Sequence, residues 1–191
     1  MLHIDYELSY GLMLSGGIDS AILLSYMADK YPKINLQCFT IPKHDGASLY
    51  ADTVIKKVNE RFGTRFNSTI FVGNPDAHHR LQSTTAINDI FDRYKIDWLF
   101  NALNTNPTEL DNLPGAPQRD KASTNPKMIF PFVDLTKDKI LEIMFNNSYD
   151  FLMEITHSCT EMQLTRCNKC WQCKERAWAF GHINKLDKGK F

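Results

Sequence analysis

The sequence predicts an α/β fold built on a mainly parallel, doubly wound sheet. Three observations lead to this prediction. Apolar segments of strand length alternate with helical segments, the first three strand segments each end at glycine or proline, and a glycine pair leads directly from the first strand into the first helix. Regular alternation of strands and helices favours parallel strands with helices on both faces of the sheet. Because such sheets bind ligands beyond the carboxyl ends of their strands, the functional site is expected at that edge.

Apolar patterning and turn residues place the individual elements. The expected strands are 10–14 (after an extended segment 2–8), 34–41, 66–71, 97–102 and 128–133, and the expected helices are 21–31, 49–62, 76–95 and 136 to about 147. Gly63 is expected to end the second helix and Thr136 to cap the fourth. Residues 104–127 hold four prolines and form a long loop. Loops of this length within a compact domain are commonly functional.

Bulk composition limits the classes of function. The chain has 191 residues, enough for a well-buried core, and is expected to form one domain over residues 1–191. It carries 22 Lys and Arg against 22 Asp and Glu, so it lacks the basic excess of a general polyanion binder, and no bulk nucleic-acid binding is expected. The start of the chain does not have the pattern of a signal peptide, and no apolar run approaches the ~18 residues that cross a bilayer. A cytoplasmic protein without a membrane partner is therefore expected.

The most specific motif is the hexad Ser-Gly-Gly-Ile-Asp-Ser, which joins the first strand to the first helix. Gly16 and Gly17 allow the backbone to approach an anion closely, and the helix start behind them offers unpaired N–H groups and the positive end of the helix dipole. Ser15 and Ser20 add hydroxyl donors, and Asp19 offers a carboxylate for a magnesium ion beside the phosphates. No Gly-Lys-Ser/Thr follows, so this is not the lysine-bearing phosphate loop. An ordinary capped turn is the alternative, but the complete hexad favours a nucleotide site.

Four cysteines in the last third of the chain have the spacing of a metal site. Cys159, Cys167, Cys170 and Cys173 follow the pattern Cys-x7-Cys-x2-Cys-x2-Cys, and four thiolates can surround one zinc ion. Cysteines in a cytosolic protein indicate metal binding or catalysis before disulfides. An iron–sulfur cluster is the main alternative, although the usual Cys-Pro is absent downstream, and free thiols or a redox pair are weaker ones. A closed zinc knuckle at about residues 156–180 leaves no position for a substrate, so its expected role is structural.

The hexad resembles the SGGxDS loop of the PP-loop ATP pyrophosphatases, whose fold is of the adenine nucleotide alpha hydrolase-like, Rossmann-like type. With the cysteine quartet added, the chain is similar to the 7-cyano-7-deazaguanine synthase family, which forms the base preQ0 in queuosine biosynthesis. Two further segments lie between these ends. Residues 131–137, Pro-Phe-Val-Asp-Leu-Thr-Lys, are similar to the proline-to-Leu-Thr-Lys segment of the family, and residues 156–159, Thr-His-Ser-Cys, are similar to its Thr-Trp-Ser-Cys. The resemblance covers most of the chain in order.

The resemblance implies an ATP-dependent carbon–nitrogen ligase. The family activates the carboxylate of 7-carboxy-7-deazaguanine with ATP, ammonia then gives an amide, and a second activation dehydrates the amide to the nitrile. The implied cofactors are ATP, Mg²⁺ and Zn²⁺, the implied partners are the carboxylated deazapurine and ammonia, and the family suggests a homodimer. The implied pyrophosphate and magnesium ligands are Ser15, Gly16, Gly17, Asp19 and Ser20, the catalytic residues Asp19, Ser20 and Lys137, and the zinc ligands Cys159, Cys167, Cys170 and Cys173. For Lys137, a solvated position in the first helical turn is the alternative.

Two segments depart from the family. Its Tyr-Pro-Asp-Cys-Arg-like segment near the substrate base is replaced here by Leu-Pro-Gly-Ala-Pro-Gln-Arg-Asp, where Arg119 and Asp120 either take over the role or form a solvated loop pair. The turn after the second strand also lacks the family's Asp-Tyr-Gly-Gln run. Two other functions therefore stay open: a PP-loop enzyme that adenylates a different acceptor, such as another small carboxylic acid or a tRNA base, and a nucleotide- or zinc-binding module without catalysis.

Overall fold

The computed structural model describes residues 3–119 and 125–189 and shows the predicted α/β architecture. Within these residues, five parallel strands form one sheet in the order β3-β2-β1-β4-β5. The strands are β1 (Tyr10–Met13), β2 (Leu36–Thr40), β3 (Ile70–Phe71), β4 (Trp98–Asn101) and β5 (Met128–Ile129). The chain proceeds from β1 to one edge and resumes at β4 on the other side of β1. The point where the strand order reverses, a common place for ligands, therefore lies between β1 and β4.

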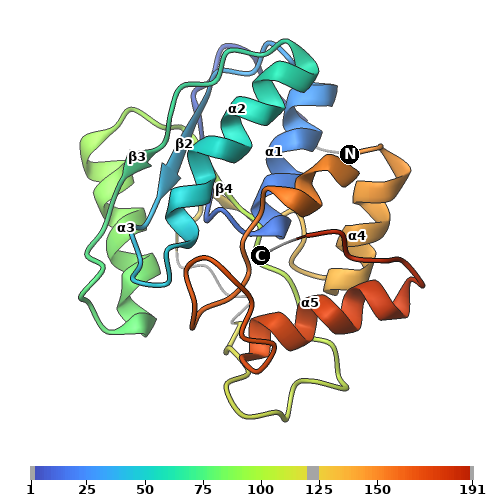
Figure 1. The fold of residues 1–191 in the computed structure, drawn as a ribbon. Helices are drawn as coiled ribbons and strands as arrows, with labels where there is room; N and C mark the ends of the chain where they lie inside the picture. The colour runs from blue at the N-terminus through green and yellow to red at the C-terminus, as the bar shows by residue number, and fades with distance from the viewer. Residues whose placement is uncertain (1–2, 120–124, 190–191) are drawn as a thin grey trace.

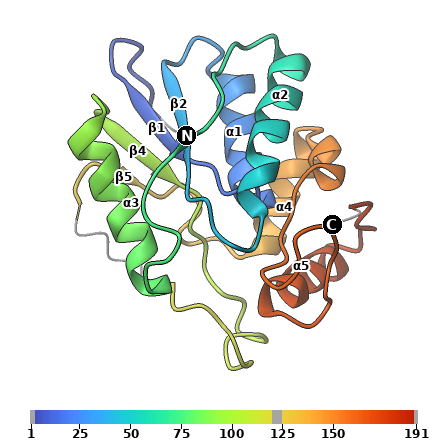
Figure 2. The same cartoon turned by 60° about the vertical axis from the view of Figure 1, so that its left-hand side comes forward.

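Helices cover both faces of the sheet. They are α1 (Ile18–Lys30), α2 (Ala51–Phe62), α3 (His79–Arg93), α4 (Lys137–Asn146) and α5 (Trp171–His182), with short 3₁₀ helices η1 (Ala47–Tyr50) and η2 (Asp150–Glu154). In Figure 1, α3 stands apart from the group of α1, α2 and α4. Figure 2 shows the strands between α3 and α1 with α2. The last helix, α5, packs against α4.

Two apolar cores, one on each face, hold these helices against the sheet. The larger core joins β1 and β2 to α1, α2, α4 and η2, and contains the fully buried Leu12 and Ile140. The smaller core lies under α3 and contains Ile90. Because successive side chains of a strand point to opposite faces, Cys38 belongs to the larger core and its neighbour Phe39 to the smaller one.

The predicted elements are all present, but the third and fifth strands are only two residues long. Side chains of α2 explain the short third strand. Asn59 accepts the N–H of Phe66 and donates to its carbonyl oxygen, and Asp52 accepts the N–H of Thr69. Helix side chains thus take up backbone groups that strand pairing would otherwise use. Gly63 ends α2 with a φ of 69°, as predicted.

Two smaller expectations need correction. The segment 2–8, expected to be extended, turns at residues 6–8, and residue 2 lies outside the described part. Thr136 is the N-cap residue of α4, as predicted, but its hydroxyl donates to the carboxylate of Asp138 instead of capping a backbone N–H. The carboxylate sits in the first turn of the helix, where the helix dipole favours negative charge.

The long loop is confirmed where the structure describes it. Residues 102–119 and 125–127 contain neither helix nor strand. The loop leaves the carboxyl end of β4 and returns to β5, so its first residues lie at the edge of the sheet where the site is expected. None of the helices in the described ranges has the length and apolar character needed to cross a membrane.

Candidate functional site

The Ser-Gly-Gly-Ile-Asp-Ser hexad forms the turn between β1 and α1. Gly17 is the N-cap residue of α1, which begins at Ile18. The hydroxyl of Ser15 accepts the N–H of Gly17 at 3.2 Å, the hydroxyl of Ser20 donates to the carbonyl oxygen of Gly17 at 3.1 Å, and the two hydroxyls lie 3.1 Å apart. The hexad therefore gathers two serine hydroxyls at the N-terminus of a 13-residue helix. This combination is suited to binding an anion.

Gly16 is required by its conformation and by its surroundings. Its φ is 80°, and a Cβ added here would lie 1.9 Å from the carbonyl oxygen of Ala47. The carbonyl oxygen of Gly16 accepts the N–H of His157 at 3.0 Å. The loop after β2 and the segment before the first cysteine of the quartet therefore both contact the glycine turn, and only a residue without a side chain fits between them.

A cavity of about 350 Å³ lies at the carboxyl edge of the sheet, as the sequence predicts. Five residues of the hexad line it, namely Ser15, Gly17, Ile18, Asp19 and Ser20. Further polar residues come from segments far apart in the sequence, among them Thr40, Asp45, Asn104, Arg119, Lys137 and Glu175. The fold thus brings the ends of β1, β2 and β4, the long loop, α4 and α5 to one hollow.

Several buried polar atoms on the wall of this cavity have no hydrogen-bond partner among the described residues. They are Oδ1 of Asp19, Oγ1 of Thr40, Nδ2 of Asn104 and the two ring nitrogens of His157. Leaving a buried polar group unpaired costs about 1–3 kcal/mol. Thr40 ends β2 and Asn104 follows β4, so they flank the hexad, which follows the central β1. Unpaired atoms on several elements around one cavity indicate that a polar ligand completes their hydrogen bonds.

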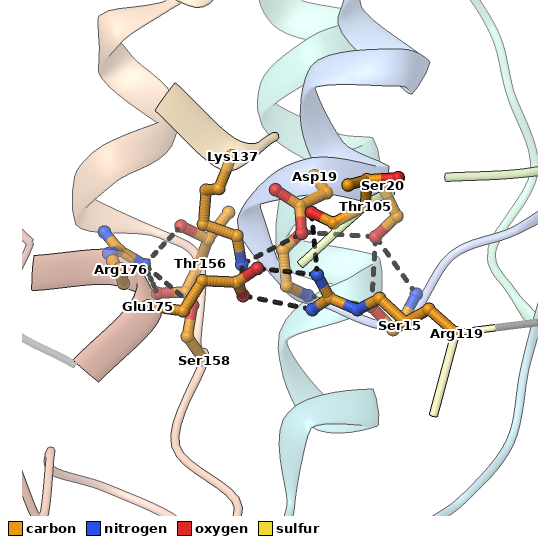
Figure 3. A network of polar contacts seen from close by, with 11 residues as sticks. Ser15, Asp19, Ser20, Thr105, Arg119, Lys137, Thr156, Ser158, Glu175 and Arg176 are labelled. Atoms are coloured by element: carbon orange, nitrogen blue, oxygen red, sulfur yellow. Dashed lines mark hydrogen bonds and ion pairs between the residues drawn. The ribbon is translucent and has the colours of Figure 1, made fainter. Parts of the chain in front are cut away.

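Lys137 is buried between two carboxylates. Its Nζ lies 3.0 Å from Oδ2 of Asp19 and 2.7 Å from Oε2 of Glu175, and its side chain is 5% exposed. Glu175, with no exposed side-chain surface, also accepts two hydrogen bonds from Arg119, at 2.6 and 3.1 Å. Figure 3 shows Glu175 between the two cations. The solvated position considered for Lys137 is therefore wrong, because the side chain lies in the cavity wall beside Asp19.

Opposite charges in this network stabilise the ionised forms of Lys137 and Glu175. Burial alone would lower the pKa of Lys137, but the carboxylates of Asp19 and Glu175 hold that pKa above its ordinary value. Burial would raise the pKa of Glu175, and Lys137 with Arg119 holds it below its ordinary value. For Asp19, burial outweighs the attraction of Lys137 and raises the pKa. A divalent cation at the unpartnered Oδ1 would favour the charged carboxylate, so Asp19 fits the expected magnesium ligand.

Arg119 is held in the cavity wall, so the solvated alternative is wrong for this member of the predicted loop pair, whereas Asp120 lies outside the described residues. The guanidinium of Arg119 lies over the ring of Trp171, 4.8 Å from its centroid, and Trp171 Nε1 donates to the carbonyl oxygen of Leu110 at 3.0 Å. The indole therefore contacts the long loop at two points, the guanidinium of Arg119 and the carbonyl oxygen of Leu110.

Sequence reasoning did not identify Thr40, Asn104 or Glu175 as site residues. No motif contains them, and each is an ordinary polar residue at the end of a strand or on a helix. The expectation that ligands bind beyond the carboxyl ends of strands could have indicated Thr40 and Asn104. For Glu175 no comparable signal exists, because only the packing of α5 on α4 brings it to Lys137.

The cysteine quartet is assembled. The Sγ atoms of Cys159, Cys167, Cys170 and Cys173 all lie within 4.8 Å of one another and could hold a metal ion. The N–H groups of Cys170 and Lys169 donate to Sγ of Cys167 at 3.2 and 3.4 Å and lower the pKa of Cys167 to about 6. The thiolate is the form that binds metal. An all-sulfur donor set suits zinc or an iron–sulfur cluster, so these residues fit the expected zinc site.

Arg176 ties α5 to the segment that bonds to the glycine turn. Its side chain is 1% exposed, and its guanidinium donates to the hydroxyls of Thr156 and Ser158, each at 3.2 Å. Two further hydrogen bonds, at 2.8 and 3.0 Å, go to Asp187. Adjacent residues of α5 therefore serve two parts of the site: Glu175 reaches the cavity, and Arg176 holds the backbone beside it (Figure 3).

Two protein families match successive parts of the chain, and each part contributes residues to this site. Residues 2–95, which include the glycine turn, match the asparagine synthase family. Residues 112–184, which include Lys137 and the cysteine quartet, match the family described as queuosine biosynthesis protein QueC. No curated protein was found that matches the chain. The two family matches confirm the resemblance drawn from the sequence: the chain is QueC-like and carries a nucleotide-binding domain of the PP-loop type, similar to the 7-cyano-7-deazaguanine synthases.

Proposed function

We propose that this protein is an ATP-dependent ligase that converts 7-carboxy-7-deazaguanine and ammonia to 7-cyano-7-deazaguanine. The cavity at the glycine turn carries the proposal, because it joins an anion-binding turn to an unpartnered carboxylate oxygen of Asp19 and to the buried Lys137. The matches to the asparagine synthase and QueC families support ATP-dependent chemistry in queuosine biosynthesis. The cysteine quartet, packed beside the cavity, fits the same class of protein.

In this proposal the glycine turn binds the part of ATP that leaves. The N-terminus of α1 with the hydroxyls of Ser15 and Ser20 holds the β and γ phosphates, and Asp19 holds Mg²⁺, which would offset phosphate charge when bound. The acceptor carboxylate attacks the α-phosphorus, the acyl adenylate forms, and the bond to pyrophosphate breaks. Negative charge then builds up on the pyrophosphate, where preorganised donors stabilise the transition state most effectively. Lys137, beside Asp19, is placed to contact the same phosphates.

We place the acceptor on the side of the glycine turn opposite Thr40, where Asn104 and Arg119 lie. Asn104 offers an unpartnered Nδ2 there, and Arg119 closes the wall. Holding the acceptor carboxylate in line with the α-phosphorus supplies much of the remaining acceleration, because a bimolecular step becomes effectively unimolecular. Ammonia then displaces AMP from the acyl adenylate to give the amide. A second activation, at the amide oxygen, removes that oxygen with AMP and leaves the nitrile.

Pyrophosphate release tests the proposal. The protein, ATP and Mg²⁺ are incubated with 7-carboxy-7-deazaguanine and ammonia present or omitted one at a time, and the base is followed by mass. We expect pyrophosphate release that depends on the base, together with the nitrile product, and loss of both in Asp19→Asn. The matched control is Asp92→Asn, which changes an exposed acid on α3. Base-independent or absent release from a folded, metal-loaded protein would overturn the assignment of this acceptor.

A further inference from the structure

Glu175 is the buried charged group in the cavity wall to which the proposed reaction gives no task. Its carboxylate contacts Lys137 at 2.7 Å through Oε2 and Arg119 at 2.6 Å through Oε1. The two cations come from separate parts of the chain, since Lys137 is the first residue of α4 and Arg119 belongs to the long loop. One fully buried carboxylate therefore joins two elements that face the same cavity.

We propose that Glu175 is a positioning residue that holds Lys137 toward the nucleotide phosphates and Arg119 toward the acceptor. This inference rests on the proposed function for the identity of the ligands. Glu175 acts through the two cations and is not assigned a contact with substrate. Glu175 lies on α5 just after Cys173, so a metal ion bound by the cysteine quartet would also fix the helix from which Glu175 reaches the cavity.

Glu175 and Asp19 share the ammonium group of Lys137. Lys137 divides its interaction between Glu175 at 2.7 Å and Asp19 at 3.0 Å. Without the carboxylate of Glu175, the ammonium would turn to Asp19 alone, the residue to which Mg²⁺ is assigned. A buried cation bound to that carboxylate would oppose the binding of a second cation there. Glu175 therefore keeps Lys137 close to the phosphates while leaving Asp19 available for the metal ion.

Two side chains of α5 contact the guanidinium of Arg119. Trp171 and Glu175 are four residues apart and lie on the same face of the helix. The indole stacks on the guanidinium at 4.8 Å, while the carboxylate forms two hydrogen bonds with it. A guanidinium held by stacking and by a bidentate carboxylate has little freedom to turn. The long loop is thus fixed to α5 at the point where it borders the cavity.

A double-mutant cycle on MgATP affinity tests the proposal without any acceptor. The variants are Glu175→Gln, Lys137→Gln and the double variant, titrated with MgATP by calorimetry at concentrations that saturate the weaker binders. Glu142→Gln, which removes a surface partner of Lys139, is the matched control. Melting temperature and bound metal are recorded for each protein, so that a loss of fold is separated from a loss of affinity.

If Glu175 acts through Lys137, Glu175→Gln weakens MgATP binding on the order of tenfold or more in the otherwise unchanged protein. In the Lys137→Gln background the same substitution changes affinity by less than about twofold. Equal losses in both backgrounds would identify a general structural role and overturn the proposal, as would unchanged affinity of Glu175→Gln. The control Glu142→Gln is expected to bind like the unchanged protein.

Glu175→Asp keeps the proposal testable if the glutamine variant does not fold. Aspartate retains the charge but withdraws the carboxylate by one methylene, so the variant should keep its metal and bind MgATP more weakly. Binding by Glu175→Asp at the original affinity would contradict the proposal. The proposed function and the role of Glu175 can fail separately. If the Glu175 and Lys137 substitutions are coupled in MgATP affinity but pyrophosphate release does not depend on the base, only the proposed acceptor is wrong. If release depends on the base but the two losses of affinity are additive, only the role of Glu175 is wrong.

Discussion

Replacing Gly16 with alanine tests how closely the loop after β2 packs on the glycine turn. Gly16 has a φ of 80°, and its added Cβ would lie 1.9 Å from the carbonyl oxygen of Ala47. Gly63 is a matched control within the same chain. It has a φ of 69°, and a Cβ added there meets nothing within 4 Å. The two substitutions impose similar backbone strain, and only the first adds a collision with backbone.

The expected losses of stability follow from this difference. An L-residue in the left-handed region costs about 1–2 kcal/mol, which is the whole expected effect of Gly63→Ala. Gly16→Ala carries the same strain and must also displace the loop at Ala47, and overpacking of this kind costs typically about 1–3 kcal/mol more. Its total is therefore about 2–5 kcal/mol. Gly16→Ala should also weaken MgATP binding, whereas Gly63→Ala, at the far end of α2, should not.

Urea unfolding of the metal-loaded proteins, followed by tryptophan fluorescence, gives the free energy of unfolding of each variant. In a thermal scan, each kcal/mol corresponds to about 2–4 °C in melting temperature for a chain of this size. Unchanged slopes of the urea transition would show that the denatured states are comparable. If Gly16→Ala cost no more than Gly63→Ala, the tight approach of the loop to the glycine turn would be refuted.

Three further outcomes are expected. Asp19→Asn should reduce base-dependent pyrophosphate release at saturating Mg²⁺ by at least about 100-fold, because the lost interactions act on the leaving group. The melting temperature should change little. Activity within tenfold of the original would contradict this prediction. Asp187→Asn should lower the free energy of unfolding by about 3 kcal/mol, because the buried guanidinium of Arg176 loses its carboxylate partner. Glu60→Gln, which removes a surface ion pair, should leave the urea midpoint unchanged. Cys170→Ser, or treatment with a strong chelator, should remove the metal detected by elemental analysis and lower the melting temperature. A metal-free protein with an unaltered melting temperature would contradict a structural role of the site.

The sequence predicted those parts of the site that lie in short, contiguous motifs. The glycine hexad, the cysteine quartet and Lys137 follow from spacing and resemblance, and the structure places all of them around or beside one cavity. Their assigned roles stay predictions until they are measured. The length of the third strand was less predictable, because the side chains of Asn59 and Asp52 compete for the backbone groups that would pair.

The amino-acid pattern by itself determined the class of fold, the glycine turn and the metal quartet, because strand–helix alternation, a turn and a metal knuckle are each specified by residues close together in the chain. Tertiary structure alone decided which charges meet. Glu175, Lys137 and Arg119 come from α5, α4 and the long loop, and no local pattern marks a carboxylate that is buried between two cations. The physical reason is that a charge tolerates burial only with partners, and those partners are supplied by the packing of distant elements.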